Sequence, residues 1–172
     1  LIKSDILVFT PKGEQKSIEK GATALDFAYA IHSAIGNKAI AAKVNFKLAP
    51  LSYVMRTGDQ VEIITAENET PKREWLQFVK TSKARKFIMD HLKSERQLIV
   101  KSGKKMLEEE LAKIGRKLTD KVIHSLMDEY ESFDCKPDEM YFKIGSGLIT
   151  LEGLDGKLRK YQADNLTVVT RS

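Results

Sequence analysis

The sequence predicts an α+β protein in which a small domain of strands and one helix precedes a mainly α-helical domain and a short β-containing C-terminal segment. Two observations predict this order. Short β-branched and aromatic runs separated by turn residues fill residues 1–65, and from Pro71 onward apolar residues recur at three- and four-residue intervals among helix formers. The 172 residues, 42% hydrophobic and 31% charged, are enough for one medium domain or two small ones.

A hairpin and a capped helix are predicted at the start of the chain. The β-branched and aromatic run Ile6–Thr10 is followed by the turn residues Pro11–Gly13 and a second short run, Gln15–Ile18. Thr23 and Asp26 then have the spacing at which two side chains satisfy free N–H groups at the start of a helix. We therefore predict a helix directly after Thr23.

Further strands are predicted after this helix, which we expect Gly36 to end. A strand over residues 39–46 is expected to turn at Asn45–Lys47 and return. Residues 60–65 alternate apolar and polar side chains, as a half-buried strand does. The order strand, strand, helix, strand, strand predicts a ubiquitin-like β-grasp domain over residues 4–66.

The remaining chain is predicted to be mainly helical. Residues 67–71 are polar and indicate a linker, and residues 72–131 carry amphipathic helical patterns that Gly103 and Gly115 are expected to interrupt. Residues 132–172 form a C-terminal extension whose fold the pattern leaves open.

Two apolar runs in the extension, 148–151 and 166–169, favour short strands. The chain begins at Leu1 rather than Met and ends just after the second run, so we expect it to be a piece of a longer protein.

The composition excludes several classes of protein. Cys135 is the only cysteine, so an intramolecular disulfide is impossible and a cytoplasmic location is expected. No apolar run approaches the roughly 18–20 residues that span a bilayer, so we expect no membrane association. The three histidines are far apart, and we find no catalytic set, metal-ligand spacing or phosphate-binding glycine loop. We therefore expect no catalytic site, metal or cofactor in this chain.

The net charge of +5 comes from one segment. Residues 71–131 hold 15 basic and 10 acidic side chains, whereas the segments before and after are neutral by count. Four cations lie close together in the run 80–86: Lys80, Lys83, Arg85 and Lys86. Cations at this density can neutralise phosphates and release counterions, which favours RNA binding. The alternative is an ordinary solvated helix face.

His32 is the second candidate for a functional residue. It lies near the end of the predicted first helix, off the centre of the apolar stripe, so it is expected to face the rim or the solvent. An imidazole there can stack on a nucleobase and form hydrogen bonds. The alternative is a histidine that is merely well placed at a helix C-terminus.

Several segments resemble the TGS domain of the RelA/SpoT stringent-response enzymes. They are Val8–Gly13, Leu25–His32, Ala42–Asn45, Leu48–Leu51 and Gly58–Ile63. The segments Arg73–Leu76 and Lys80–Arg85 are similar to the start of the helical domain that follows TGS in those enzymes. Phe46 and Lys72 depart from the pattern, because the family commonly has Gly and a Ser-type residue at these two places.

The resemblance implies a regulatory fragment of a GTP pyrophosphokinase, an enzyme that makes and in some members also hydrolyses (p)ppGpp. Its catalytic domains would lie N-terminal to this chain, so the fragment itself is not expected to be an enzyme. The resemblance further implies that His32 reads the CCA 3′ end of deacylated tRNA on the ribosome. The basic helix start would then contact the tRNA backbone.

The resemblance also implies a second kind of partner. Some TGS domains of this family are held to bind acyl carrier protein or to contact the parent's own catalytic half. Acyl carrier protein is acidic, so the same basic surface would serve, and the residues leave the two partners open.

Overall fold

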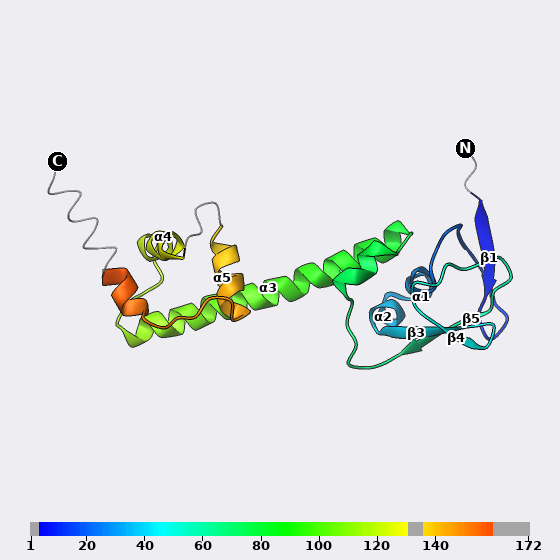
Figure 1. The fold of residues 1–172 in the computed structure, drawn as a ribbon, viewed down its shortest axis with the longest axis horizontal. Coiled ribbons are helices and arrows are strands. Elements are labelled where there is room, and N and C mark those ends of the chain that lie inside the picture. Colours follow the sequence, from blue (N-terminus) through cyan, green and yellow to red (C-terminus); the bar gives the residue numbers. More distant parts are fainter. Residues whose placement is uncertain (1–3, 131–135, 160–172) are drawn as a thin grey trace. The chain divides into compact units, whose positions relative to one another are not determined.

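The computed structural model describes residues 4–130 and 136–159 (Figure 1). It divides into two compact units between Lys93 and Ser94. The elements of the first unit are β1 (Asp5–Phe9), β2 (Gln15–Glu19), α1 (Ala24–Ile31), α2 (Ser33–Asn37), β3 (Ala39–Val44), β4 (Lys47–Ala49), β5 (Val61–Thr65) and the 3-10 helix η1 (Arg73–Gln77). Helix α3 (Ser82–Lys113) contributes its first part to this unit.

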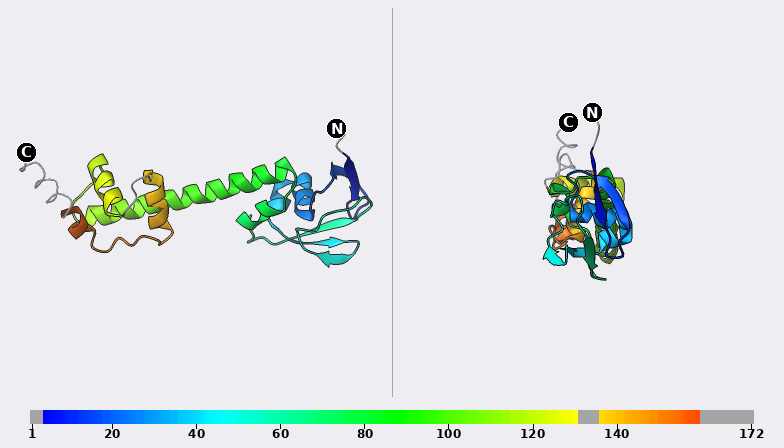
Figure 2. Two further views of the ribbon diagram at one scale, coloured as in Figure 1. Left: turned by 45° about the horizontal axis from the view of Figure 1, so that its top comes forward. Right: turned by 90° about the vertical axis from the view of Figure 1, so that its right-hand side faces the viewer.

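The first unit has the predicted β-grasp architecture. Strands β1 and β2 form an antiparallel hairpin, and a second antiparallel sheet has the order β4-β3-β5. A parallel bridge between Phe9 and Gln60 connects the two sheets. Helix α1 lies against them (Figure 2). Its Phe27 is fully buried in a cluster with Val8 and Val61.

The opposite side of α1 packs on residues from beyond the β-grasp domain. Leu25 and Tyr29 share a buried cluster with Trp75 of η1 and Ile88 of α3. The Tyr29 ring also stacks on Phe87, with ring centroids 6.0 Å apart. The start of the predicted helical domain therefore completes the core of the first unit.

The turn between β3 and β4 is strained. It has two residues, Asn45 and Phe46, and both have positive φ angles, of 52° and 70°. This is the backbone of a type I′ hairpin, which normally takes Asn-Gly. Phe46 is 82% exposed, so packing of its ring does little to offset the free-energy cost of the left-handed backbone.

Asp59 fixes the residues around this turn. Its carboxylate, only 7% exposed, accepts hydrogen bonds from Nδ2 of Asn45, the hydroxyl of Tyr53 and the backbone N–H of Arg56, at 2.9, 2.9 and 2.8 Å. Burial alone would raise the pKa of Asp59, but these hydrogen bonds and the charge of Arg56 outweigh it and hold the pKa below its ordinary value.

The second unit is helical. It contains the rest of α3 together with α4 (Asp120–Glu129) and α5 (Pro137–Gly145), and residues 154–159 are helical as well. Its core consists of fully or nearly fully buried apolar residues from all of these segments: Leu107, Leu111, Val122, Leu126, Met140, Tyr141, Ile144, Leu154 and Leu158.

Gly103 does not interrupt the helix, contrary to our prediction. Helix α3 is continuous through it, and the glycine instead permits a close crossing with α5. A Cβ atom at Gly103 would lie 1.8 Å from the carbonyl oxygen of Tyr141, and one at Gly145 would lie 2.3 Å from that of Ile99. Gly115, with φ of 71°, follows the end of α3 as predicted.

Two strand predictions near the C-terminus have different outcomes. Residues 148–151 form no strand; Ile149 and Leu151 pack against the helical core from a loop, where no described strand is present to pair with them. Residues 166–169 lie outside the described residues.

Candidate nucleic-acid interface

A buried carboxylate organises the candidate site. Asp26 lies in the first turn of α1, is 1% exposed, and forms the predicted capping box with Thr23. Its Oδ2 accepts from the backbone N–H and the hydroxyl of Thr23, both at 2.8 Å. The same carboxylate accepts from the N–H groups of Lys80 and Thr81 at 2.9 Å and from the hydroxyl of Thr81 at 2.8 Å.

Asp26 therefore holds the starts of two helices. The Thr81 hydroxyl, besides donating to Asp26, accepts from the backbone N–H of Ala84 at 3.2 Å and so caps the first turn of α3. These two bonds commit the Thr81 hydroxyl to the fold rather than to a ligand.

Three of the four predicted cations are available to a ligand. Lys80, Lys83 and Lys86 have exposed side chains at the start of α3, and within residues 4–130 and 136–159 none of them lies within ion-pair distance of a carboxylate. Lys83 and Lys86 are three residues apart and so share one side of the helix. The aliphatic part of the Lys80 side chain runs past Gly21. A Cβ atom at Gly21 would lie 3.7 Å from Cε of Lys80.

Arg85 has a different environment. Its guanidinium donates to the carbonyl oxygens of Leu76 and Val79, at 3.3 and 3.4 Å. Leu76 lies in η1 and Val79 follows η1, so Arg85 helps to fix the turn between η1 and α3. A ligand that recruits Arg85 has to compete with these two bonds.

His32 separates α1 from α2. Its backbone is extended, so the helix that we expected to run to Gly36 ends at Ile31 and restarts at Ser33. The ring is exposed, and its Nδ1 accepts from the backbone N–H of Ala34 at 3.0 Å. A neutral ring in this arrangement carries its proton on Nε2. The predicted exposure is confirmed, and the cap fixes the ring at the α1–α2 junction.

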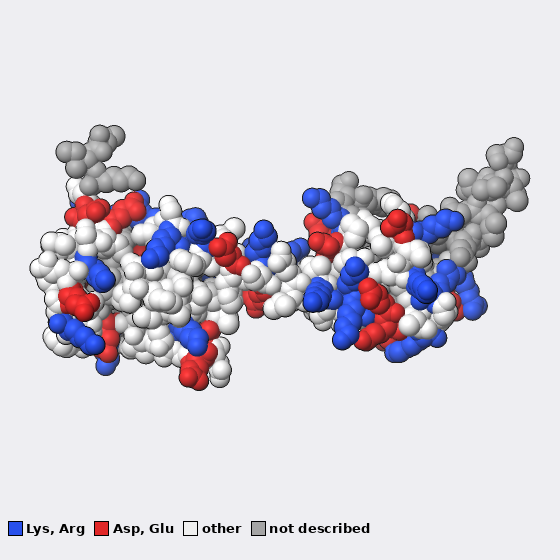
Figure 3. Space-filling view, turned by 180° about the vertical axis from the view of Figure 1, so that it is seen from behind, with Lys and Arg blue, Asp and Glu red and all other residues white. Residues whose placement is uncertain are grey.

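Lys80 and His32 lie at opposite ends of α1. The backbone N–H of Lys80 donates to Asp26 in the first turn of α1, whereas His32 follows the last turn, about 9 Å further along the helix axis at the usual rise per residue. On the face of the first unit seen in Figure 3, Lys and Arg are scattered over a largely uncharged surface rather than gathered into one patch.

Among residues 4–130 and 136–159, no group of three His, Cys, Asp or Glu side chains has a metal-binding arrangement. In that part of the chain, no helix combines the length and the apolar character that a bilayer crossing requires.

Two family models match the chain. Residues 6–65 match the TGS domain, and residues 92–154 match the RelA/SpoT AH domain. The chain belongs to the RelA/SpoT family. This confirms the resemblance seen in the sequence and extends it into the second unit. In this RelA/SpoT chain the AH match begins inside α3, so the cations at residues 80–86 lie between the two matched domains.

Similar proteins are enzymes of (p)ppGpp metabolism. The chain is 37% identical over 162 residues to a GTP pyrophosphokinase from Myxococcus xanthus, covering 92% of this chain. It is 39% identical over 155 residues, 90% of its length, to a guanosine-3′,5′-bis(diphosphate) 3′-pyrophosphohydrolase from Aquifex aeolicus. It is 38% identical over 151 residues, 85% of its length, to a GTP pyrophosphokinase from Escherichia coli. The chain spans 21%, 22% and 20% of these three relatives, about a fifth of each.

Proposed function

We propose that this chain is the regulatory part of a cytoplasmic (p)ppGpp synthetase or hydrolase and that it reads the CCA 3′ end of deacylated tRNA on the ribosome. Catalysis would then belong to other domains of the parent protein, to which the chain relays the state of the tRNA. The RelA/SpoT membership and the relatives' enzymatic names support this assignment.

The observation that carries the proposal is the exposed ring of His32, held by its own helix cap. Because Nδ1 is engaged by Ala34, the ring has a fixed anchor, and its face and Nε2 remain for a base or a ribose hydroxyl. A pocket that closes around a free terminal ribose has no room for an esterified amino acid, so aminoacylated tRNA is rejected by a steric clash.

The lysines at the start of α3 supply a second kind of contact. Lys80, Lys83 and Lys86 are exposed cations on a segment that Asp26 holds rigidly, so they can contact phosphates without sequence preference. Each phosphate contact contributes about 0.7–0.9 to the slope of log affinity against log salt.

The decisive experiment compares deacylated tRNA binding by the wild-type chain and by His32→Asn. Asparagine is a good N-cap, so α2 keeps its side-chain cap while the aromatic ring is lost. We expect affinity to fall about five- to hundredfold, the range for one stacked base. His124→Asn, at an exposed histidine of α4, is the matched control and should bind like wild type.

Equal affinity of His32→Asn and wild type would refute the role of His32. Measuring the binding of tRNA and of acyl carrier protein at two salt concentrations distinguishes these two partners. If Lys83→Gln with Lys86→Gln weakens carrier-protein binding and leaves tRNA binding unchanged, the lysines serve a protein contact instead.

A further inference from the structure

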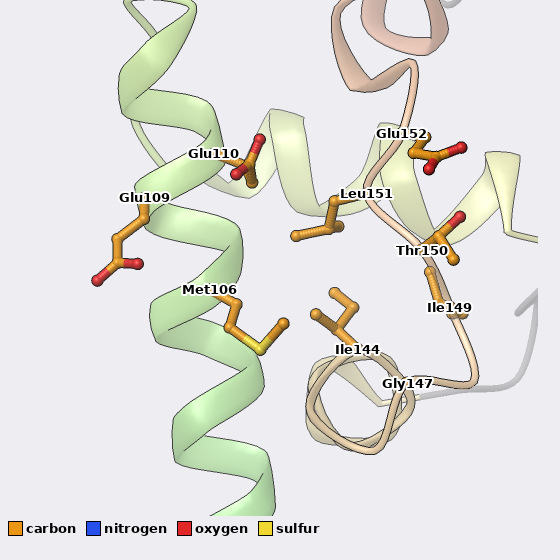
Figure 4. Close-up of a pocket in the computed structure, with 9 residues that line it drawn as sticks. All are labelled: Met106, Glu109, Glu110, Ile144, Gly147, Ile149, Thr150, Leu151 and Glu152. Carbon is orange, nitrogen blue, oxygen red and sulfur yellow. The ribbon is translucent and has the colours of Figure 1, made fainter.

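A groove in the second unit combines apolar walls with acidic edges. It lies between α3, α5 and the loop at residues 147–152, and its volume is about 550 Å³, within the usual range for ligand sites (Figure 4). The side chains of Met106, Ile144 and Leu151 point toward its centre. Glu110 on α3 and Glu152 on the loop flank Leu151 from opposite sides.

Met106, in the apolar wall of the groove, is exposed rather than part of the buried core. Met106 is 42% exposed and is not among the residues of the buried cluster beneath it. A thioether on an unbranched side chain adapts readily to different apolar partners. Met106 thus offers contact area to a ligand while contributing little to the core.

The charge of the groove selects its ligand. Three of the nine lining residues are glutamates and none is Lys or Arg, although the chain as a whole is basic. Nζ of Lys113 lies 2.6 Å from Oε1 of Glu110 in an exposed ion pair, and Glu152 takes part in no ion pair within the described residues. Carboxylates in this arrangement repel phosphates and attract ammonium or guanidinium groups.

We propose that this groove binds a basic amphipathic polypeptide segment. An aliphatic side chain of that segment fills the space between Met106, Ile144 and Leu151, and a neighbouring Lys or Arg lies between Glu110 and Glu152. The site is separate from the proposed reading of tRNA, and its test needs no RNA.

The probe is a fluorescein-labelled 12-residue peptide of Leu and Lys in amphipathic order, titrated with the full chain and followed by anisotropy. Two further peptides replace every Lys by Glu or every Leu by Ser. We expect saturable binding of the Leu/Lys peptide alone. We also expect ¹H–¹⁵N shifts confined to residues around the groove, including Ile144 and Leu151.

Variants test the two halves of the site. Glu110→Gln with Glu152→Gln should weaken binding about three- to tenfold, the sum expected for two exposed charge contacts. Met106→Lys places an ammonium group in the groove and should abolish binding; the exposure of Met106 makes the change compatible with folding. Glu95→Gln with Asp128→Asn removes two exposed carboxylates outside the groove and should have no effect.

Equal weakening by the control pair, or equal binding of the Ser/Lys peptide, would overturn the proposal, because either result indicates nonspecific charge attraction. ¹H–¹⁵N shifts at Ile144 and Leu151 on addition of tRNA without the peptide would also overturn it, since the groove would then accept a nucleic acid.

Discussion

Replacing Asp26 by Asn should destabilise the first unit strongly, although the two side chains have the same shape. In the wild type, Oδ1 accepts from Lys80 N–H, Thr81 N–H and the Thr81 hydroxyl, and Oδ2 accepts from Thr23 N–H, the Thr23 hydroxyl and Lys80 N–H. An amide has to place its NH₂ group at one of these two positions. Either choice points a donor at a backbone N–H that has no alternative acceptor.

The magnitude follows from the bonds lost. In either orientation at least one backbone N–H and one hydroxyl lose a charged acceptor at a site that is 1% exposed. Hydrogen bonds to charged groups contribute about 1.5–3 kcal/mol each, so the loss is about 3–6 kcal/mol. This is a large part of the roughly 5–15 kcal/mol that stabilises a typical domain.

Urea unfolding followed by tryptophan fluorescence measures this loss. Trp75 is the only tryptophan and lies 6% exposed in the cluster that joins α1 to α3, so its signal reports on the first unit. Asp5→Asn, at an exposed carboxylate that accepts one bond from Ser17, is the control and should cost less than about 0.5 kcal/mol. A loss below about 1 kcal/mol for Asp26→Asn would refute the anchoring role.

Three further predictions concern the turn, the helix crossing and acid stability. Phe46→Gly should raise the free energy of unfolding by about 0.5–1 kcal/mol in urea, because relief of the left-handed backbone exceeds the added entropy of the glycine; a loss of stability would contradict this. Gly103→Ala should destabilise the second unit by at least about 1 kcal/mol in thermal unfolding, because the methyl group meets the Tyr141 carbonyl, whereas Gly156→Ala, with open space around it, should not. The depressed pKa of Asp59 stabilises the fold above the carboxyl's unfolded pKa, and this stability is lost as pH falls through the lower folded pKa. Asp59→Asn should therefore flatten the fall in stability below about pH 4, and an unchanged pH profile would exclude this contribution.

The order of elements in the first unit could be predicted because each signal is local. The capping pair Thr23 and Asp26, the alternation in β5 and the turn at Asn45 each depend on residues a few positions apart. Such patterns reflect backbone geometry directly, so tertiary contacts rarely reverse them.

The remaining features depend on distant contacts. Gly103 looked like a helix breaker because its propensity is poor, but the approach of α5 makes a residue without a side chain necessary there. The second role of Asp26 joins it to residues 54 and 55 positions away, which no local pattern indicates. The exposure of His32 was predictable from the helix face, whereas its cap on Ala34 required the break between the two helices.

The shared anchor at Asp26 also limits how the domains of this chain can be exchanged. A graft cut at the boundaries of the TGS match, residues 6–65, would carry a buried carboxylate whose donors from Lys80 and Thr81 stay behind. It would also expose the face of Tyr29 that Phe87 covers. In this chain, the segment that can be transferred with its core intact extends through Ile88. It is therefore longer than the TGS match, which ends at residue 65.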